Sequence, residues 1–318
     1  MLSDSELALV DLGLMLKHHD YRFVTITPES HRRVVGRAPA QVANDLRGVF
    51  GWNQPFYAAT LPAPMTSLLQ KAKLVREEGE LLRSEIRVSS IDDQLFVHSA
   101  FPTDDKSAVF FGPDTYRYVR LLRQSVNSSQ RIVDVGCGSG VGGIMMAKAA
   151  KRIVLTDIND RALSFARVNA ELAGITTQVE ILHSDVLTSV EGTFDTVICN
   201  PPYLVDESKR TYRDGGGEHG TDFALRVVRE SLERLPPSGR IILYTGTCIV
   251  DGVDVLRRDL AKLTAGNKLN YTYEELDPDI FGEELETPAY RDVERIAAVA
   301  FVANVESGSR GRATATMP

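Results

Sequence analysis

From Arg131 onward, short segments rich in β-branched residues alternate with longer segments whose apolar residues recur at helical spacing. This alternation is typical of successive strand and helix units, which assemble into a parallel sheet with helices on both faces. Strands are expected at 131–135, 152–156, 177–182, 194–199 and 239–245, and helices at 141–150, 161–174, 222–235 and 252–263. Two last strand candidates are 269–276 and 293–305. The sequence therefore predicts an α/β fold with a doubly wound, mostly parallel seven-stranded sheet that carries an appended antiparallel strand.

The chain before Arg131 has a different pattern. Helices are expected at 6–17, 31–35, 43–49 and 66–77, and two alternating segments that turn at Asp92-Asp93 predict a strand pair. The expected division is a small helical domain over 1–82, a bridging β-hairpin over 83–108, and a large ligand-binding domain over 109–305. Residues 306–318 contain few large apolar side chains and are expected to form a disordered tail.

Composition excludes several classes of protein. With 43% hydrophobic and 25% charged residues the chain is an ordinary globular protein, and no run of about 18 apolar residues exists to span a membrane. The N-terminus carries acids where a signal peptide would carry bases, which favours a cytoplasmic location. Cys137, Cys199 and Cys248 lack C-x-x-C spacing, so we expect buried or half-buried thiols with no disulfide and no metal site.

A glycine-rich turn follows the first strand of the large domain, in the segment Asp134-Val135-Gly136-Cys137-Gly138-Ser139-Gly140. Such a turn lets a ligand approach backbone N–H groups and a helix N-terminus. Residues 138–143 also fit the G-x-G-x-x-G pattern of dinucleotide sites, and Asp157 lies 19 residues after Gly138. An NAD-dependent oxidoreductase is therefore an alternative.

Asp134 favours a different cofactor. An acid directly before the glycines would repel a pyrophosphate but would stabilise an ammonium group, which S-adenosyl-L-methionine carries. We therefore expect S-adenosyl-L-methionine to be bound by Asp134 and by Gly136, Cys137, Gly138, Ser139 and Gly140. Asp157, after the second strand, would accept hydrogen bonds from the ribose hydroxyls. Asp185 and Val186, after the third strand, would meet the adenine edge.

The tetrapeptide Asn200-Pro201-Pro202-Tyr203 follows the fourth strand and should reach the carboxyl edge of the sheet, where ligands bind in open α/β folds. An amide or exocyclic amine nitrogen is a poor nucleophile because its lone pair is delocalised. The Asn200 side-chain oxygen and the Pro201 carbonyl can accept its two protons, and Pro202 restricts the backbone of Pro201. Tyr203 offers a flat face for stacking. The segment therefore predicts methyl transfer to a planar nitrogen.

The glycine-rich residues 215–220 come shortly after this tetrapeptide. They are either a mobile lid beside the catalytic loop or a flexible connection.

The region from about Phe110 to Val305 resembles the HemK-type branch of the small-domain, class I, Rossmann-like methyltransferases. Three segments carry the resemblance: Gly112-Pro113-Asp114-Thr115, residues 134–140, and residues 200–203. It implies that Thr115 lies near the methionine part of the cofactor. It also implies a glutamine side chain of a translation release factor as substrate, held by a helical N-terminal domain. Residues 1–82 are helical but carry no motif of that family.

Two other function classes stay open. Related enzymes with N-P-P-Y or N-P-P-F methylate the exocyclic amine of adenine or guanine in RNA or DNA, after the base has been flipped out. Residues 77–318 have a net charge of -10, which disfavours binding of a polyanion, whereas residues 1–76, at +3, favour it. Protein glutamine is slightly preferred over nucleic acid, so the expected partner is a macromolecule, either a protein or RNA. A non-catalytic scaffold is disfavoured because both motifs are intact.

Overall fold

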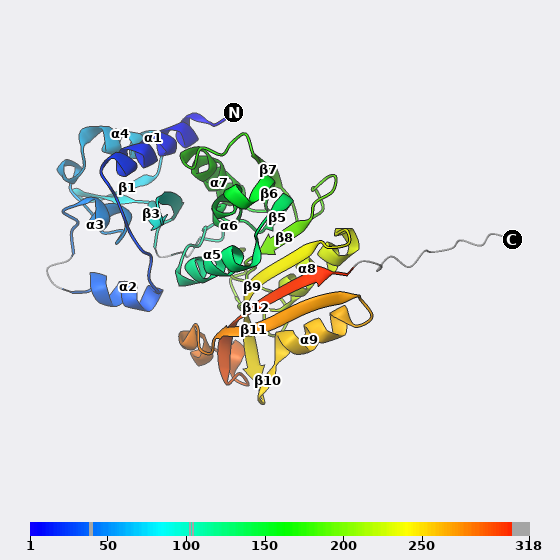
Figure 1. The fold of residues 1–318 in the computed structure, drawn as a ribbon. Coiled ribbons are helices and arrows are strands. Elements are labelled where there is room, and N and C mark those ends of the chain that lie inside the picture. Colours follow the sequence, from blue (N-terminus) through cyan, green and yellow to red (C-terminus); the bar gives the residue numbers. More distant parts are fainter. Residues whose placement is uncertain (38–40, 102, 104, 307–318) are drawn as a thin grey trace.

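The computed structural model describes residues 1–37, 41–101, 103 and 105–306. Its centre is an eight-stranded sheet in which seven strands lie in the order β11-β12-β9-β8-β5-β6-β7, while β10 pairs only with β9 (Figure 1). All pairs from β7 to β9 are parallel, and β12 runs antiparallel to both of its neighbours. The strands are β5 (Ser129–Val135), β6 (Ala150–Asp157), β7 (Val179–His183), β8 (Thr196–Cys199), β9 (Arg240–Val250), β10 (Val253–Asp254), β11 (Leu269–Asp277) and β12 (Arg295–Val305). The predicted doubly wound, mostly parallel sheet with an appended antiparallel strand is confirmed.

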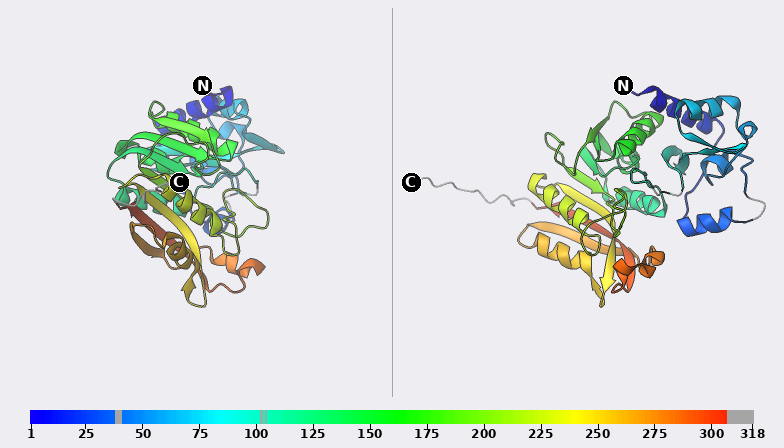
Figure 2. Two further views of the ribbon diagram at one scale, coloured as in Figure 1. Left: turned by 90° about the vertical axis from the view of Figure 1, so that its right-hand side faces the viewer. Right: turned by 180° about the vertical axis from the view of Figure 1, so that it is seen from behind.

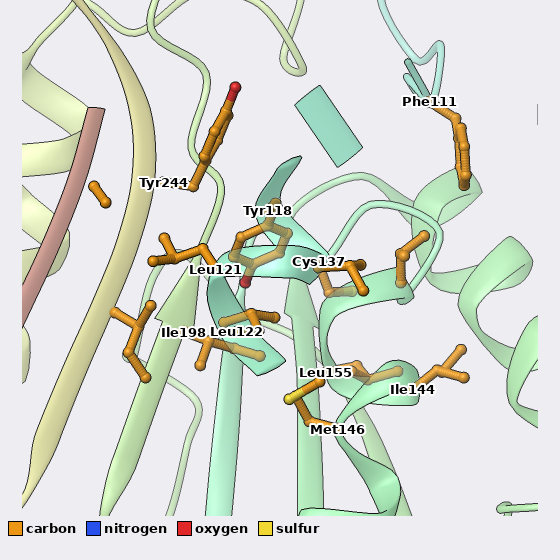
Figure 3. Close-up of a cluster of buried hydrophobic side chains, with 14 of the residues drawn as sticks. Phe111, Tyr118, Leu121, Leu122, Cys137, Ile144, Met146, Leu155, Ile198 and Tyr244 are labelled. Atoms are coloured by element: carbon orange, nitrogen blue, oxygen red, sulfur yellow. The ribbon is translucent and has the colours of Figure 1, made fainter. Parts of the chain in front are cut away.

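Helices cover both faces of this sheet: α5 (Pro113–Ser125), α6 (Val141–Met145), α7 (Asp160–Leu172), α8 (Asp222–Arg234) and α9 (Val255–Thr264). Side chains alternate across β5, so Ile132 packs with α5 and α6 while Val133 and Val135 pack with α8 and α9. Figure 3 shows part of the first layer, with Leu121 and Leu122 of α5 beside Ile198 of β8.

Two features of this region differ from the sequence-based expectation. The helix predicted at 141–150 ends at Met145, and a 3-10 turn, η2 (Ala147–Ala149), leads into β6 at Ala150. Pairing of β6 with β5 and β7 outweighs the helix propensity of the alanines, which is a weak local preference. Helix α5 was not predicted, although Pro113 stands in its first turn.

The N-terminal part contains α1 (Asp4–His18), α2 (Pro28–Val35), α3 (Leu46–Phe50), η1 (Ala58–Thr60) and α4 (Ala63–Lys71). It also contains two hairpins, β1 (Val75–Glu78) with β2 (Leu81–Ser84), and β3 (Ile86–Ile91) with β4 (Gln94–Ser99). The second hairpin turns at Asp92, as predicted. The helix predicted at 66–77 is wrong at its end, because Lys73 adopts a positive φ of 57° and Val75 begins β1.

Helix α1 packs directly on α7 of the large domain, and the views of Figure 2 show the two parts in contact. Phe165, Val168 and Leu172 of α7 belong to the same apolar cluster as the buried residues of α1, α3 and α4. Glu6 accepts hydrogen bonds from Ser164 and Arg167, at 2.9 and 2.8 Å. The N-terminal part therefore shares a core with the large domain. The expected boundary between residues 82 and 83 passes through β2, and the division of the chain into 1–82, 83–108 and 109–305 stays a prediction.

The predicted tail over 306–318 lies outside the described residues from 307 onward. No helix in the described part of the chain is long and apolar enough to cross a membrane.

Candidate functional site

A cavity of about 350 Å³ opens at the carboxyl edge of β5, β6 and β8. This is where ligands bind in open α/β sheets, and the volume lies within the range of small-molecule sites. Its walls come from the loops after β5, β6, β7 and β8, the start of α5, and the segments 108–110 and 209–214. The fold thus brings most of the sequence-predicted site residues to one place.

The turn after β5 forms one wall of this cavity. Gly136, Gly138 and Gly140 have φ values of 63°, 54° and 81°, a region that side chains other than glycine rarely adopt. The backbone N–H of Cys137 donates to Thr156 O at 2.9 Å, which ties the turn to β6. Ser139 is buried, and its hydroxyl has no partner among the described residues. The turn therefore presents its backbone, together with one unsatisfied hydroxyl.

Asp134 lies beneath this turn and is almost completely buried, at 1% exposure. Its carboxylate accepts hydrogen bonds from the backbone N–H of Gly143, at 2.8 Å, and from the Tyr118 hydroxyl, at 3.3 Å. Burial raises the pKa of Asp134 to about 7, because the charged form loses its hydration. An ammonium group in the cavity would favour the charged form and lower that pKa.

Asp157 and Val186 line the cavity, but Asp185 does not. Asp157 accepts hydrogen bonds from the backbone N–H groups of Gly138 and Asn159, both at 2.9 Å, and burial raises its pKa. Asp185 instead forms a two-pronged ion pair with Arg226 of α8, at 2.8 and 2.9 Å, and its side chain is 55% exposed. The sequence located the loop after β7 but could not show that α8 supplies a competing partner.

The segment Asn200-Pro201-Pro202-Tyr203 borders the same cavity. Asn200 directly follows β8, and its side chain makes no hydrogen bond within the described part of the chain. The Tyr203 ring meets Phe281 edge to face, with ring centroids 5.9 Å apart. Asn200 is thus available to a ligand, whereas Tyr203 is held by its neighbours.

Asp114 holds Tyr203 in place, a role that the sequence alone did not indicate. Its buried carboxylate accepts hydrogen bonds from the hydroxyls of Tyr203, at 3.0 Å, and Tyr244, at 2.6 Å. Arg117 donates to it at 3.1 Å. Thr115, the neighbour singled out from the sequence, lines the cavity, and its side-chain oxygen accepts a hydrogen bond from Gly112 N at 3.2 Å. Tyr118 also lines the cavity, and its ring centroid lies 6.4 Å from that of Tyr244 (Figure 3).

The glycine-rich residues 215–220 pack against the backbone of the N-P-P-Y segment. A Cβ on Gly220 would lie 2.1 Å from Tyr203 O, and one on Gly215 would lie 2.8 Å from Pro202 O. The backbone N–H of Gly215 donates to Leu204 O at 2.8 Å. In this structure the segment supports the N-P-P-Y backbone, because only glycine permits so close an approach.

Aromatic side chains of the cavity lining were also missed by the sequence analysis. The rings of Phe110 and Tyr212 stack 6.0 Å apart, and the Tyr212 hydroxyl donates to Thr103 O at 2.8 Å. Phe223 and Phe281 complete the apolar lining. Their spacing in the sequence carries no shared pattern, so only the fold reveals them.

The three cysteines are buried and free, as expected. Among the described residues, one group could hold a metal ion, Glu218, His219 and Asp292, and it lies outside the cavity lining.

A glycine turn and an N-P-P-Y segment on neighbouring parallel strands define a class I methyltransferase site. Comparison with known proteins agrees, because residues 114–248 match the model of the methyltransferase small domain family. A putative protein N5-glutamine methyltransferase from Methanocaldococcus jannaschii is 30% identical over 168 residues, 50% of this chain and 84% of that protein. The chain belongs to the HemK-type branch of the class I S-adenosylmethionine-dependent methyltransferases.

Other relatives match over a smaller share of their length. The release factor glutamine methyltransferase of Koribacter versatilis is 35% identical over 164 residues, 46% of this chain and 58% of that protein. The chain spans about half the length of the curated relatives that it matches first, between 47% and 58%. Trm5b from Pyrococcus abyssi has a similar fold, with a TM-score of 0.50 at 16% identity over 89% of this chain and 79% of that one.

Proposed function

We propose that this protein transfers a methyl group from S-adenosyl-L-methionine to the side-chain amide nitrogen of a glutamine in a protein. The observation that carries the proposal is the unpartnered Asn200 side chain beside the Pro201 carbonyl, at the edge of the cavity that also contains Asp134 and Asp157. Relatives named as protein glutamine methyltransferases support this substrate class.

The residues of the cavity fit the cofactor. Asp134 provides a buried acid for an ammonium group, and Asp157 provides a carboxylate for hydroxyl groups. The unsatisfied Ser139 hydroxyl offers a further polar contact, since a buried hydroxyl without a partner is costly. Val186 and Phe223 provide apolar surface for a purine ring. Asp185 does not serve this purpose in the present arrangement, because Arg226 binds it.

When bound, S-adenosyl-L-methionine supplies a methyl group activated by the adjacent positive sulfur. The protein has to localise the lone pair of the target nitrogen and aim it at that methyl group. The Asn200 oxygen and the Pro201 carbonyl accept the two amide protons, and the fixed Tyr203 ring limits rotation of the planar group. No strong base is needed, because a proton can leave after the transfer. The main source of the rate enhancement is therefore the alignment of the target nitrogen with the methyl group and the sulfur.

Residues 1–82 are proposed to present the macromolecular substrate. Helix α1 is attached firmly to α7, so this part has a defined position relative to the cavity. Residues 1–76 of this part carry a net charge of +3, which would also tolerate RNA, but the likeness to Trm5b concerns the fold alone.

The experiment is transfer of labelled methyl from S-adenosyl-L-methionine to purified release factor and, in parallel, to ribosomal RNA. The proposal expects label in protein, at a glutamine side chain located by mass spectrometry of the digest. Label found only in RNA would show that the substrate is a nucleic acid and not a protein. Binding of NAD in preference to S-adenosyl-L-methionine, measured by calorimetry, would overturn the reaction itself.

A further inference from the structure

A second cavity, of about 450 Å³, lies in the N-terminal part, between α2, the residues after α3 and the β1-β2 hairpin. Three of its walls are rings: His31 has its centroid 4.8 Å from that of Phe101 and 5.7 Å from that of Trp52. His31 is 4% exposed, and its Nδ1 has no hydrogen-bond partner in the described part of the chain. A polar atom left unsatisfied in the wall of a cavity is costly, which suits a site that a ligand completes.

The rim of this cavity has an excess of positive charge. Glu78 Oε1 accepts hydrogen bonds from both Arg76 Nη2 and Arg83 Nε, each at 2.7 Å. One carboxylate is thus shared by two guanidinium groups, and one positive charge is left unbalanced. The Arg76 side chain is 58% exposed, and within the described ranges its guanidinium group bonds only to Glu78, so further N–H donors are left for a ligand. A second carboxylate would complete this arrangement, because guanidinium groups bind carboxylates with paired hydrogen bonds.

The two cavities are close enough for one partner to reach both. Phe101 lines the second cavity, and Ala108 is the first residue along the chain that lines the main cavity. The seven peptide steps between them span at most about 25 Å when fully extended. A folded protein or a short peptide can bridge this distance.

We propose that the second cavity binds an acidic residue of the protein substrate, with its carboxylate at Arg76 and Arg83 and its neighbouring apolar group against Trp52 and Phe101. This inference rests on the proposed protein substrate. A nucleic acid suits the site less well, because Glu78 lies in the wall and would repel a phosphate group. The lining holds Arg32, Arg76 and Arg83 against Glu78 alone, so a carboxylate would offset part of its positive charge.

Trp52 makes the test direct, because it is the only tryptophan of the chain. The probe is the dipeptide acetyl-Glu-Phe-amide, and acetyl-Gln-Phe-amide is its uncharged match. Titration with acetyl-Glu-Phe-amide should change the Trp52 emission until the site is saturated. Acetyl-Gln-Phe-amide should bind about tenfold more weakly, which is the loss expected when a hydrogen-bonded charge is removed. Equal affinity for the two dipeptides, or tighter binding of tetrauridylate than of acetyl-Glu-Phe-amide, would overturn the proposal.

Charge reversal of the rim provides the matched variants. Arg76→Glu should weaken acetyl-Glu-Phe-amide binding about tenfold or more, whereas Arg258→Glu on α9 should not, although it changes the net charge equally. Arg258 is a suitable control because it is similarly exposed, at 48%, and pairs with Asp259. Unchanged affinity in a folded Arg76→Glu protein would refute the site.

The kinetic consequence separates this inference from the proposed function. With a protein substrate, Arg76→Glu should raise KM and leave kcat unchanged, because the cavity lies outside the catalytic segment. If the unaltered enzyme transfers no methyl group to protein, the proposed function fails, while the fluorescence titration still decides whether the cavity binds carboxylates.

Discussion

Replacing Asp114 with asparagine should loosen Tyr203 and slow methyl transfer while leaving cofactor affinity nearly unchanged. Asp114 is 3% exposed and accepts hydrogen bonds from Tyr203, Tyr244 and Arg117. An asparagine amide has one acceptor oxygen where the carboxylate has two. At least one of the two tyrosine hydroxyls therefore loses its acceptor.

The expected size follows from that loss. A buried donor without a partner costs about 1 to 3 kcal/mol, which is the expected decrease in the free energy of unfolding. If the Tyr203 hydroxyl is the donor that loses its acceptor, its ring is no longer fixed by that hydrogen bond. A loss of this energy in the transition state should lower kcat roughly ten- to a hundredfold. Tyr203 borders the proposed substrate position, whereas the proposed cofactor contacts are to Asp134 and Asp157, which make no hydrogen bond to Asp114. The KM for S-adenosyl-L-methionine should therefore change little.

The assay is labelled methyl transfer to the protein substrate, with kcat and both KM values measured, beside urea unfolding. Asp277→Asn is the matched control, because it removes the second ion pair of Arg117, at 2.7 Å, without contacting Tyr203. A partly exposed pair of this kind contributes about 1 kcal/mol or less, so kcat should stay near its original value.

A double-mutant cycle tests the coupling. From the sequence, Tyr203→Phe should be mild because the ring face remains, but the bond to Asp114 predicts a loss close to that of Asp114→Asn. The double variant should be no slower than the slower single variant, because both changes remove one interaction. A folded Asp114→Asn protein with unchanged kcat, or strictly additive effects, would show that Asp114 does not position Tyr203.

Three further predictions concern the site and the core. Asn200→Ala should reduce methyl transfer about a hundred- to a thousandfold with cofactor affinity within a few fold, and Asn200→Asp should retain more activity than alanine; an unchanged rate in single-turnover assays would place catalysis elsewhere. Burial raises the pKa of Asp134 to about 7, so the folded protein keeps a proton that the unfolded chain releases near pH 4. The free energy of unfolding should therefore fall as pH rises from about 4 to about 7, and Asp134→Asn should flatten that slope in chemical denaturation; the same slope in both proteins would contradict the buried acid. Phe165→Ala should destabilise the chain by about 3 to 5 kcal/mol and leave one calorimetric transition, since Phe165 belongs to the core shared by α1 and α7; two separated transitions would argue for independent units.

The location of the candidate site could be predicted from the sequence because it depends on local chain order. A glycine turn after a strand and the N-P-P-Y segment after another place backbone groups and one amide at the same sheet edge, whatever the rest of the chain does. The alternation of strand and helix patterns likewise determined the parallel sheet, since each pattern buries a defined face. Both the position of the site and the parallel sheet could therefore be predicted without knowing which distant residues are in contact.

The tertiary structure decided which partners those residues meet. Asp185 was predicted to face the adenine edge, but Arg226, 41 residues later in the chain, binds it on the outside. Asp114 appeared only as part of a family segment, and its role follows from Tyr244, which lies 130 residues away and is buried beside it. Residues 75–77 looked helical, yet pairing with β2 made them a strand. For Asp185 and Asp114 the deciding contact joins residues far apart in sequence, and for residues 75–77 it is pairing within a hairpin. Local propensity and spacing contain neither kind of contact.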